Sequence, residues 1–460
     1  MNNTNNYDMN EYIGKVRELV LSMQKPLKAH IKSYGCQLNF CDGDKLKRLA
    51  SEMGFELCED ELQSDLIVFN TCAVRENAED RAFGNIGFAK HIKEKNPNTV
   101  IALCGCMAQQ EHIAEKIKKS YPFVDIVFGT SAQSHFPELL YNKLVFGRNL
   151  CDITEYNDGI NEEINPLRQG FPKASVPIMY GCNNFCTYCV VPYVRGRERS
   201  RNYENILSEV KQLIKDGYKE IMLLGQNVNS YDGDITFPEL LRRINDIDGD
   251  FVVRFMSSHP KDASKDLIDT VIDCEKMAKQ IHLPVQSGSN AVLERMNRRY
   301  TVEKYLEIID YARSRVPDFS FSSDILLGFP DESREDFEAT LALMERVKYD
   351  NLYTFIYSKR ERTKAALMPD CVTEKEKSER MGELLALQRK ITTESYKRFM
   401  GKTLRVLADS ESKTAENWLL GKSYEGIIVE FPGDKSLLGQ FVNVKINNTK
   451  NWAVEGVVVE

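Results

Sequence analysis

Short apolar runs alternate with helical repeats between Lys28 and Gly129, and this alternation predicts a parallel α/β sheet. The expected strands are Ala29 to Tyr34, Leu66 to Asn70, Val100 to Leu103 and Asp125 to Phe128. In an open parallel sheet the carboxyl ends of the strands lie on one edge, so residues that follow these strands should converge there.

A second series of strands and helices follows a polar connector. Its expected strands are Ala174 to Met179, Glu220 to Leu224, Phe251 to Met256, Gln280 to Pro284, Phe319 to Leu327 and Leu352 to Tyr357. Amphipathic helices are expected over Tyr203 to Lys215, Thr301 to Arg315 and Arg334 to Val347. Repeated β/α units of this kind predict a barrel or partial barrel with its functional face at the strand ends.

The pattern changes again after a charged helical stretch, Lys375 to Phe399. The β-rich runs that follow predict a small all-β barrel: Thr403 to Ala408, Ser423 to Phe431, Gln440 to Ile446 and Ala453 to Val459. The expected α/β chain therefore divides into a polar N-terminal extension (1–26), an α/β sheet domain (27–150), a linker (151–172), a partial barrel (173–398) and the β domain (399–460).

Composition narrows the class of protein. The 460 residues, 42% of them hydrophobic, are typical of a globular chain of about three domains. The first residues contain no signal peptide, and no segment is long and apolar enough to span a membrane. We therefore expect a cytoplasmic protein whose twelve Cys bind metal or take part in catalysis rather than form disulfides. The net charge of −7 argues against a generally basic nucleic-acid binder, so any RNA contact should come from local patches.

The strongest chemical signal is the loop with Cys182, Cys186 and Cys189. Three thiols at CxxxCxxC spacing are typical of a four-iron cluster whose fourth iron has no protein ligand, whereas structural zinc requires four closed ligands. Zinc completed by a distant Cys274 or Cys371 is the alternative. A free iron could bind the amino and carboxylate groups of S-adenosylmethionine (SAM), and one electron would then release an adenosyl radical.

A second set of thiols follows the first three expected strands: Cys36, Cys72 and Cys106. Their shared position predicts a second cluster, although small buried Cys that fill strand ends are the alternative. Three other Cys receive structural roles: Cys41, Cys58 and Cys104.

Polar and Gly-rich loops follow the strands of the expected partial barrel. Together with Tyr188, they form a candidate cofactor cradle of Gly225, Gln226, Asn227, Ser257, Gln286 and Gly328. His259 lies at one strand end and could line the site or act as a structural hydrogen-bonding group. No acid/base pair is assigned, since hydrogen abstraction by a radical needs none.

Alternate arginines follow the thiol loop: Arg195, Arg197, Arg199 and Arg201. The planar guanidinium fork suits phosphate, so these residues form a candidate RNA contact. Internal pairing with Glu198, Glu204 or other carboxylates is the alternative.

Three segments carry a family resemblance: Ser33 to Asn39 (SYGCQLN), Asn70 to Arg81 (NTCAVRENAEDR) and Gly181 to Arg201 (GCNNFCTYCVVPYVRGRERSR). With them the chain resembles the radical SAM methylthiotransferases over nearly its whole length. The Arg-rich segment and Arg75-Glu-Asn favour the tRNA branch that acts on isopentenyladenosine over those that act on threonylcarbamoyladenosine or a ribosomal-protein aspartate.

The resemblance implies a methylthiotransferase domain, a radical SAM core and a C-terminal TRAM domain. It also implies SAM and two [4Fe-4S] clusters: one on Cys182, Cys186 and Cys189 that makes the 5′-deoxyadenosyl radical, the other supplying methylated sulfur. That second cluster would be held by Cys36, Cys72 and Cys106. The target would be carbon 2 of N6-isopentenyladenosine at tRNA position 37.

The implied partners are a tRNA anticodon stem-loop, an electron donor such as flavodoxin or ferredoxin, and a sulfur or cluster donor; the enzyme would be a monomer. The chain departs from the family at Arg362 in Tyr357-Ser-Lys-Arg-Glu-Arg362-Thr, where Gly is usual, which puts the shape of this loop in doubt. Two alternatives stay open. One is a methylthiotransferase for threonylcarbamoyladenosine tRNA or a ribosomal-protein side chain, and the other is a zinc-stabilised RNA-binding protein.

Overall fold

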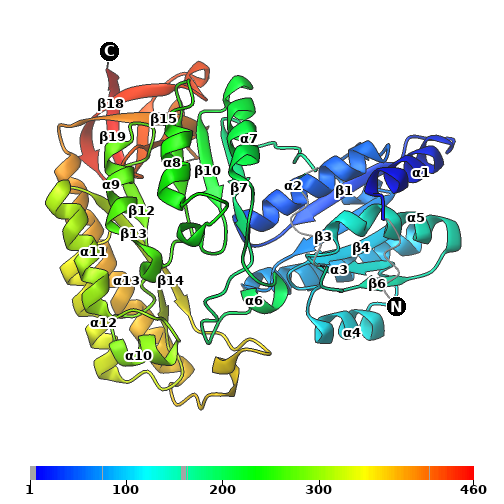
Figure 1. Cartoon of the computed structure of the whole chain (residues 1–460), viewed down its shortest axis with the longest axis horizontal. Helices are drawn as coiled ribbons and strands as arrows, with labels where there is room; N and C mark the ends of the chain where they lie inside the picture. Colours follow the sequence, from blue (N-terminus) through cyan, green and yellow to red (C-terminus); the bar gives the residue numbers. More distant parts are fainter. Residues whose placement is uncertain (1–6, 75, 157–161, 163, 414, 460) are drawn as a thin grey trace. The chain divides into compact units, whose positions relative to one another are not determined.

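A computed structural model describes residues 7–74, 76–156, 162, 164–413 and 415–459. The chain divides into two compact units, which are described separately (Figure 1). Unit 1 comprises Met1–Gln169, Tyr180–Asn183 and Cys189–Arg199, and unit 2 comprises Gly170–Met179, Asn184–Tyr188 and Ser200–Glu460. The thiol loop is thus shared between the units, rather than belonging to the second alone.

Unit 1 is built on a parallel sheet in the order β2-β1-β3-β4-β5-β6, which confirms the expected fold class. Its strands are β1 (Lys28–Ser33), β2 (Glu56–Leu57), β3 (Leu66–Thr71), β4 (Val100–Gly105), β5 (Ile126–Phe128) and β6 (Leu150–Asp152). Its helices are α1 (Met9–Leu21), α2 (Gln37–Glu52), α3 (Glu76–Lys95), α4 (Glu111–Ser120), α5 (Phe136–Phe146) and α6 (Val191–Val194).

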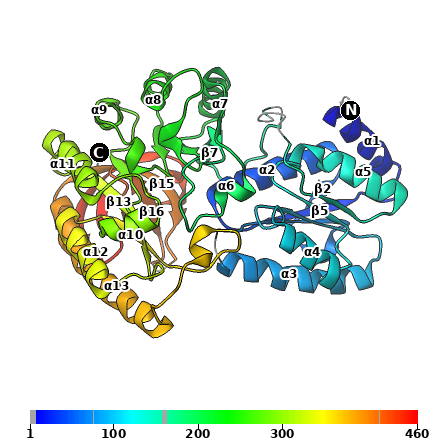
Figure 2. The ribbon, with the colours of Figure 1, turned by 60° about the horizontal axis from the view of Figure 1, so that its bottom comes forward.

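Successive side chains of the central strands enter two different cores. In β3, Leu66 and Val68 pack with α1, α2 and α5, while Ile67 and Phe69 pack with α3 and α4 on the other face (Figure 2). Because both faces are covered, β3 and β4 are buried along their whole length. This explains why they appear in the sequence as continuous apolar runs.

The N-terminal segment is more than a polar extension. Helix α1 begins after an Asp8 cap and buries Met9, Ile13, Val16 and Val20 in the core of unit 1. The expected linker also begins later than predicted, because β6 occupies Leu150–Asp152. Part of that linker, residues 157–161 and 163, lies outside the described residues, as does Arg75.

Unit 2 contains two parallel sheets, in the orders β11-β10-β7 and β12-β13-β14. A parallel bridge pairs Val253, in β11, with Met277, just before β12. This bridge joins the two sheets into an open, partial barrel. The strands are β7 (Lys173–Pro177), β10 (Glu220–Leu224), β11 (Val252–Phe255), β12 (Gln280–His282), β13 (Ser320–Leu327) and β14 (Asn351–Ile356). The short strands β8 (Met179–Tyr180) and β9 (Arg199–Ser200) pair with each other.

Amphipathic helices cover the outside of these sheets (Figure 1). They are α7 (Tyr203–Lys215), α8 (Phe237–Asn245), α9 (Lys265–Asp273), α10 (Asn290–Arg295), α11 (Val302–Arg315) and α12 (Arg334–Val347). Helices α7 and α12 have the predicted bounds, because each combines a polar N-cap, Asn202 or Ser333, with an apolar face repeating every three or four residues. None of the described helices has the length and apolar character needed to cross a bilayer.

A long helix, α13 (Glu374–Tyr396), leads to the C-terminal region, where the described residues form a closed β-barrel in the order β15-β16-β17-β19-β18. The strands are β15 (Thr403–Glu411), β16 (Trp418–Ser423), β17 (Ile428–Pro432), β18 (Phe441–Thr449) and β19 (Val454–Val459). The predicted all-β domain is confirmed. The sequence pattern missed β16, which occupies a separate run before the expected second strand.

Candidate functional site

Cys36, Cys72 and Cys106 lie where three neighbouring strands end. Cys36 follows β1 and caps α2, Cys72 follows β3, and Cys106 follows β4. Since β1, β3 and β4 are adjacent in the sheet, the thiols share one edge. Cys36 and Cys72 are hydrogen-bonded to each other, and Cys36 and Cys106 are close enough to interact electrostatically. The structure therefore brings these predicted residues together.

A glycine makes this approach possible. Gly35, with φ +95°, has no side chain to obstruct Cys72: a Cβ at position 35 would lie 2.2 Å from Cys72 Cβ and 2.4 Å from Cys72 Sγ. Only glycine accommodates both this close contact and the left-handed backbone without strain. The SYGC motif is thus a structural requirement of the thiol site.

Burial and neighbouring groups determine the protonation of these thiols. The hydrogen bond with Cys72, followed by burial, raises the pKa of Cys36. Burial raises the pKa of Cys106, and Arg195 acts in the opposite direction. Cys104 lies in β4 and packs in the core, and burial raises its pKa well above the ordinary value, which agrees with its assigned structural role.

The second thiol set is shared between the units. Cys182 and Cys189 belong to unit 1, whereas Cys186 belongs to unit 2. Cys182 and Cys186 are buried and Cys189 is partly buried. Within the described chain, no group of three or more His, Cys, Asp and Glu side chains is placed so that it could hold a metal ion. Assigning clusters to the two thiol sets therefore remains a prediction.

The segment after α10 holds the Cys186 part of the loop within unit 2. The side-chain amide of Asn297 donates to the carbonyls of Asn184 and Phe185, at 3.2 and 3.0 Å. Thr187 donates its hydroxyl to Arg295 O and its N–H to Met296 O. These bonds fix a loop that includes the left-handed Phe185 (φ +48°). Tyr188 is partly buried against an apolar cluster that includes Phe329 and Tyr357.

The other predicted cofactor-facing residues follow the strands of the partial barrel. Gly225, Gln226 and Asn227 follow β10, and Ser257, Gln286 and Gly328 follow β11, β12 and β13. The last three have left-handed backbones, with φ of 67°, 71° and 64°. Arg362, where the family usually has Gly, is also left-handed (φ +66°), so the loop keeps the conformation that glycine favours.

Several buried polar atoms at these strand ends have no hydrogen-bond partner among the described residues: Gln226 Oε1, Asn227 Oδ1, Ser258 Oγ and His259 Nε2. Nδ1 of His259 accepts from the Lys261 N–H, which leaves the Nε2 proton without an acceptor. Burial, then Arg298 and Lys261, lowers the pKa of His259 to about 2, so this imidazole is neutral. Buried polar groups generally require partners, which suits a polar ligand here.

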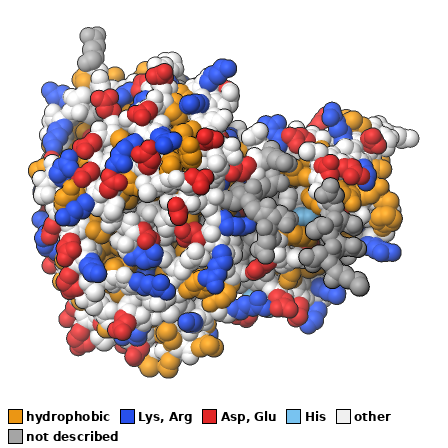
Figure 3. Space-filling model, in the orientation of Figure 1, with side chains coloured by type: hydrophobic (Ala, Val, Ile, Leu, Met, Phe, Trp, Pro, Cys, Tyr) orange, Lys and Arg blue, Asp and Glu red, His pale blue; other side chains and the backbone are white. Residues whose placement is uncertain are grey.

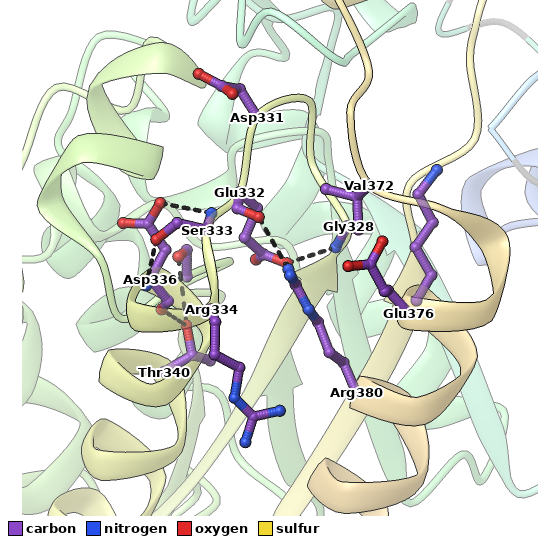
Figure 4. A network of polar contacts seen from close by, with 12 residues as sticks. Gly328, Asp331, Glu332, Ser333, Arg334, Asp336, Thr340, Val372, Glu376 and Arg380 are labelled. Atoms are coloured by element: carbon purple, nitrogen blue, oxygen red, sulfur yellow. Dashed lines mark hydrogen bonds and ion pairs between the residues drawn. The ribbon is translucent and has the colours of Figure 1, made fainter.

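A buried ion pair supports Gly328 (Figure 4). The Gly328 N–H donates to Glu332 Oε2 at 2.9 Å, and Nη1 of Arg380, on α13, donates to the same oxygen at 2.9 Å. Burial raises the pKa of Glu332 against the effects of Gly328 and Arg380. Lys377 also packs against Gly328, where a Cβ would lie 2.6 Å from the Lys377 side chain. Sequence reasoning did not single out Glu332 or Arg380.

The predicted RNA-contacting arginines separate into two groups. Arg195 is buried and pairs with Asp42 at 2.7 Å, and Arg201 is buried and pairs with Glu209 at 2.7 Å. The RNA-binding prediction is therefore wrong for these two side chains, because internal carboxylates already hold them. Arg197 is exposed and Arg199 is partly buried. Basic and acidic side chains are interspersed over the face in Figure 3.

Comparison with family models gives three matches that follow one another along the chain. The "uncharacterized protein family UPF0004" model matches residues 28–129, the radical SAM superfamily residues 176–344, and the TRAM domain residues 397–459.

Two similar proteins bear the same name, tRNA-2-methylthio-N(6)-dimethylallyladenosine synthase. The protein from Thermoanaerobacter pseudethanolicus is 49% identical over 440 residues, covering 95% of this chain and 93% of the relative. The protein from Acetivibrio thermocellus is 45% identical over 458 residues, covering 97% and 95%.

Solved structures share the fold at low sequence identity. The radical SAM methyltransferase TsrM from Kitasatospora setae has a TM-score of 0.53 and 14% identity, with 75% of each chain covered. The cobalamin-dependent SAM radical enzyme OxsB has a TM-score of 0.53 and 13% identity, with 80% of this chain and 56% of that chain covered.

Proposed function

The chain belongs to the radical SAM methylthiotransferases, the family of the tRNA-2-methylthio-N(6)-dimethylallyladenosine synthases, and we propose that it modifies N6-isopentenyladenosine at position 37 of tRNA. It is a tRNA methylthiotransferase that uses SAM and [4Fe-4S] clusters. The resemblance seen in the sequence is confirmed. The alternatives, a different methylthio acceptor or a zinc-stabilised RNA-binding protein, are not favoured.

Cys36, Cys72 and Cys106 would hold the cluster that provides the sulfur. The observation that supports this assignment is their convergence at one sheet edge, with Cys36 and Cys72 already in contact. Three thiol ligands leave one iron of a four-iron cluster without a protein ligand. The raised pKa of Cys36 also means that iron must displace a proton when it binds.

Cys182, Cys186 and Cys189 would hold the cluster that binds SAM. The bound groups supply an adenosyl radical, and the protein contributes binding and orientation. The amino group, adenine and ribose of SAM carry hydrogen-bond donors, which match the unpartnered acceptors Gln226 Oε1 and Asn227 Oδ1. The strand-end loops would therefore bind SAM and exclude water from it.

The tRNA would be held chiefly by other regions than the buried arginines. The TRAM barrel matches a domain type that the family uses to grip tRNA. Exposed Arg197 and partly buried Arg199 would contact phosphate near the thiol loop. The anticodon stem-loop is the expected binding element, because the target nucleotide must leave its stack to reach a buried cofactor.

The domain boundaries remain proposals: a sheet domain that includes α1 and extends through β6, a linker from 153 to 172, a radical SAM core over 173–398 and a TRAM domain over 399–460. The remaining partners are also proposals: a one-electron donor such as flavodoxin or ferredoxin, and a donor of sulfur or of whole clusters. We further propose that the enzyme is cytoplasmic, because its substrate is tRNA, and that it acts as a monomer.

Two single variants test the division of labour between the thiol sets. Cys182→Ala should abolish SAM cleavage, whereas Cys72→Ala should leave cleavage intact and stop methylthiolation of tRNA. Cys104→Ala is the matched control, because Cys104 is a buried thiol of the same sheet without a proposed ligand role. Anaerobically purified protein should contain about eight irons. Equal loss of SAM cleavage in Cys72→Ala and Cys182→Ala, or stoichiometric zinc, would contradict the proposal.

A further inference from the structure

Each thiol set has one buried arginine that donates to a cysteine sulfur. In unit 2, Arg298 Nη1 lies 3.5 Å from Cys186 Sγ. In unit 1, Arg195 Nε lies 3.1 Å from Cys106 Sγ. Both guanidinium groups are at least nine-tenths buried, so water screens their charge only weakly.

The other partners of Arg298 are uncharged. Its Nη2 donates to Pro284 O at 2.8 Å and its Nε to the Tyr300 hydroxyl at 3.1 Å. Among the residues that the structure describes, no carboxylate forms an ion pair with Arg298. The positive charge beside Cys186 is therefore not neutralised locally. The low pKa of His259, caused by burial and by this and other cations, is in keeping with a positive local field.

Arg195 is in the opposite situation. Its Nη2 donates to Asp42 Oδ2 at 2.7 Å and lies 3.3 Å from Asn39 Oδ1. Asp42 is itself largely buried, so the pair contributes almost no net charge beside Cys106. The two sites thus have the same sulfur contact but a different charge balance.

This difference matters for electron transfer, because reducing a cluster adds one negative charge to it. A nearby cation that is not neutralised stabilises the reduced cluster and raises its reduction potential, whereas a neutral ion pair has a much smaller effect. On the cluster assignments proposed above, we infer that Arg298 determines which of the two clusters receives the electron. It raises the potential of the cluster on Cys182, Cys186 and Cys189 above that of the other cluster.

A single electron from a one-electron donor would then reduce the SAM-binding cluster first. The donor would lose one electron and that cluster would gain it, while the cluster on Cys36, Cys72 and Cys106 would stay oxidised. This order places the electron where SAM is cleaved and keeps it away from the sulfur that is to be transferred.

The test uses two full-length proteins, each reconstituted with iron and sulfide and retaining one cluster. They are Cys36→Ala/Cys72→Ala/Cys106→Ala and Cys182→Ala/Cys186→Ala/Cys189→Ala. The iron content of each is measured first, and a loss of about half the iron in each verifies the assignments. If either protein keeps all its iron, the proposed function fails and the arginine test is not reached.

Midpoint potentials are then measured by dithionite titration, followed by electron paramagnetic resonance. Arg298→Met should lower the potential of the SAM-binding cluster by at least about 59 mV, a tenfold change in the ratio of reduced to oxidised cluster at fixed donor potential. Arg298→Lys keeps the charge and should retain most of the wild-type potential. A merely structural role for Arg298 would not separate Met from Lys in this way.

Asp42→Asn supplies the matched measurement at the other site. Removing the carboxylate leaves Arg195 uncompensated, so the potential of the second cluster should rise, and Asp42→Asn/Arg195→Met should return it towards the wild-type value. Unchanged potentials in Arg298→Met with full iron overturn the inference. If Arg298→Met fails to bind iron, an unchanged potential in Asp42→Asn overturns it instead.

Discussion

Replacing Arg380 by Met should destabilise unit 2 far more than replacing the nearby Arg334. Arg380 is 8% exposed and its partner Glu332 is 1% exposed, with 2.9 Å between Nη1 and Oε2. Arg334, on α12, pairs with Glu383 at 2.8 Å, but these side chains are 49% and 43% exposed. Figure 4 shows both arginines, so one view contains the test and its matched control.

The expected loss of stability follows from the environment of the Glu332 carboxylate, which loses its ion-pair partner. Arg380→Met leaves Glu332 buried, with Oε1 unpartnered among the described residues and only the Gly328 N–H on Oε2. Breaking one side of a buried pair costs about 3–5 kcal/mol, whereas an exposed pair contributes about 0–1 kcal/mol. Because burial already raises the pKa of Glu332, the loss should be smaller at low pH, where Glu332 is protonated.

Urea unfolding of the metal-free full chain, followed by far-ultraviolet circular dichroism, measures the loss of unfolding free energy in each variant. The loss is calculated from the shift of the urea midpoint, with the same slope m for all proteins. Tryptophan fluorescence is unsuitable, since Trp418 and Trp452 both lie in the C-terminal region. The double variant Arg380→Met/Glu332→Gln should be more stable than Arg380→Met, because it removes both charges. Equal losses in Arg380→Met and Arg334→Met, each below about 1 kcal/mol, would refute the reasoning.

Two further predictions concern the thiol edge and the strand-end histidine. Gly35→Ala should destabilise unit 1 by at least about 1–2 kcal/mol and lower the iron content of the protein, because the new Cβ would overlap Cys72. Gly84→Ala is the control, because Gly84 has open space around it and the variant should keep its stability and iron. Full iron content in both variants would contradict the prediction. The lowered pKa of His259, about 2, makes the folded state bind fewer protons than the unfolded state below about pH 6.5. Wild-type protein should therefore lose about 2 kcal/mol relative to His259→Asn between pH 6.5 and pH 5, measured by urea unfolding at each pH; parallel pH curves would exclude it.

The predicted elements that the structure reproduces are those with a strong local signal. Helices α7 and α12 have both a capping residue and a regular apolar repeat, and β3 and β4 are uninterrupted apolar runs. Helix α1 was missed although Met9, Ile13, Val16 and Val20 have helical spacing, because the Asn-rich start of the chain concealed it. That spacing is the signal that could have found it.

Among the candidate site residues, the thiols illustrate what the sequence by itself determines about this protein. The apolar runs that mark the strands are local properties, and the carboxyl ends of parallel strands lie at one edge of a sheet, so the positions of Cys36, Cys72 and Cys106 at one edge could be predicted. The partners of the buried arginines could not be predicted from the sequence. Arg195 meets Asp42, which lies 153 positions away in the sequence, whereas Arg298 meets no carboxylate in the described chain. Only the tertiary structure decides such pairs, because burial and charge balance depend on which distant segments pack together, and no local repeat encodes that choice.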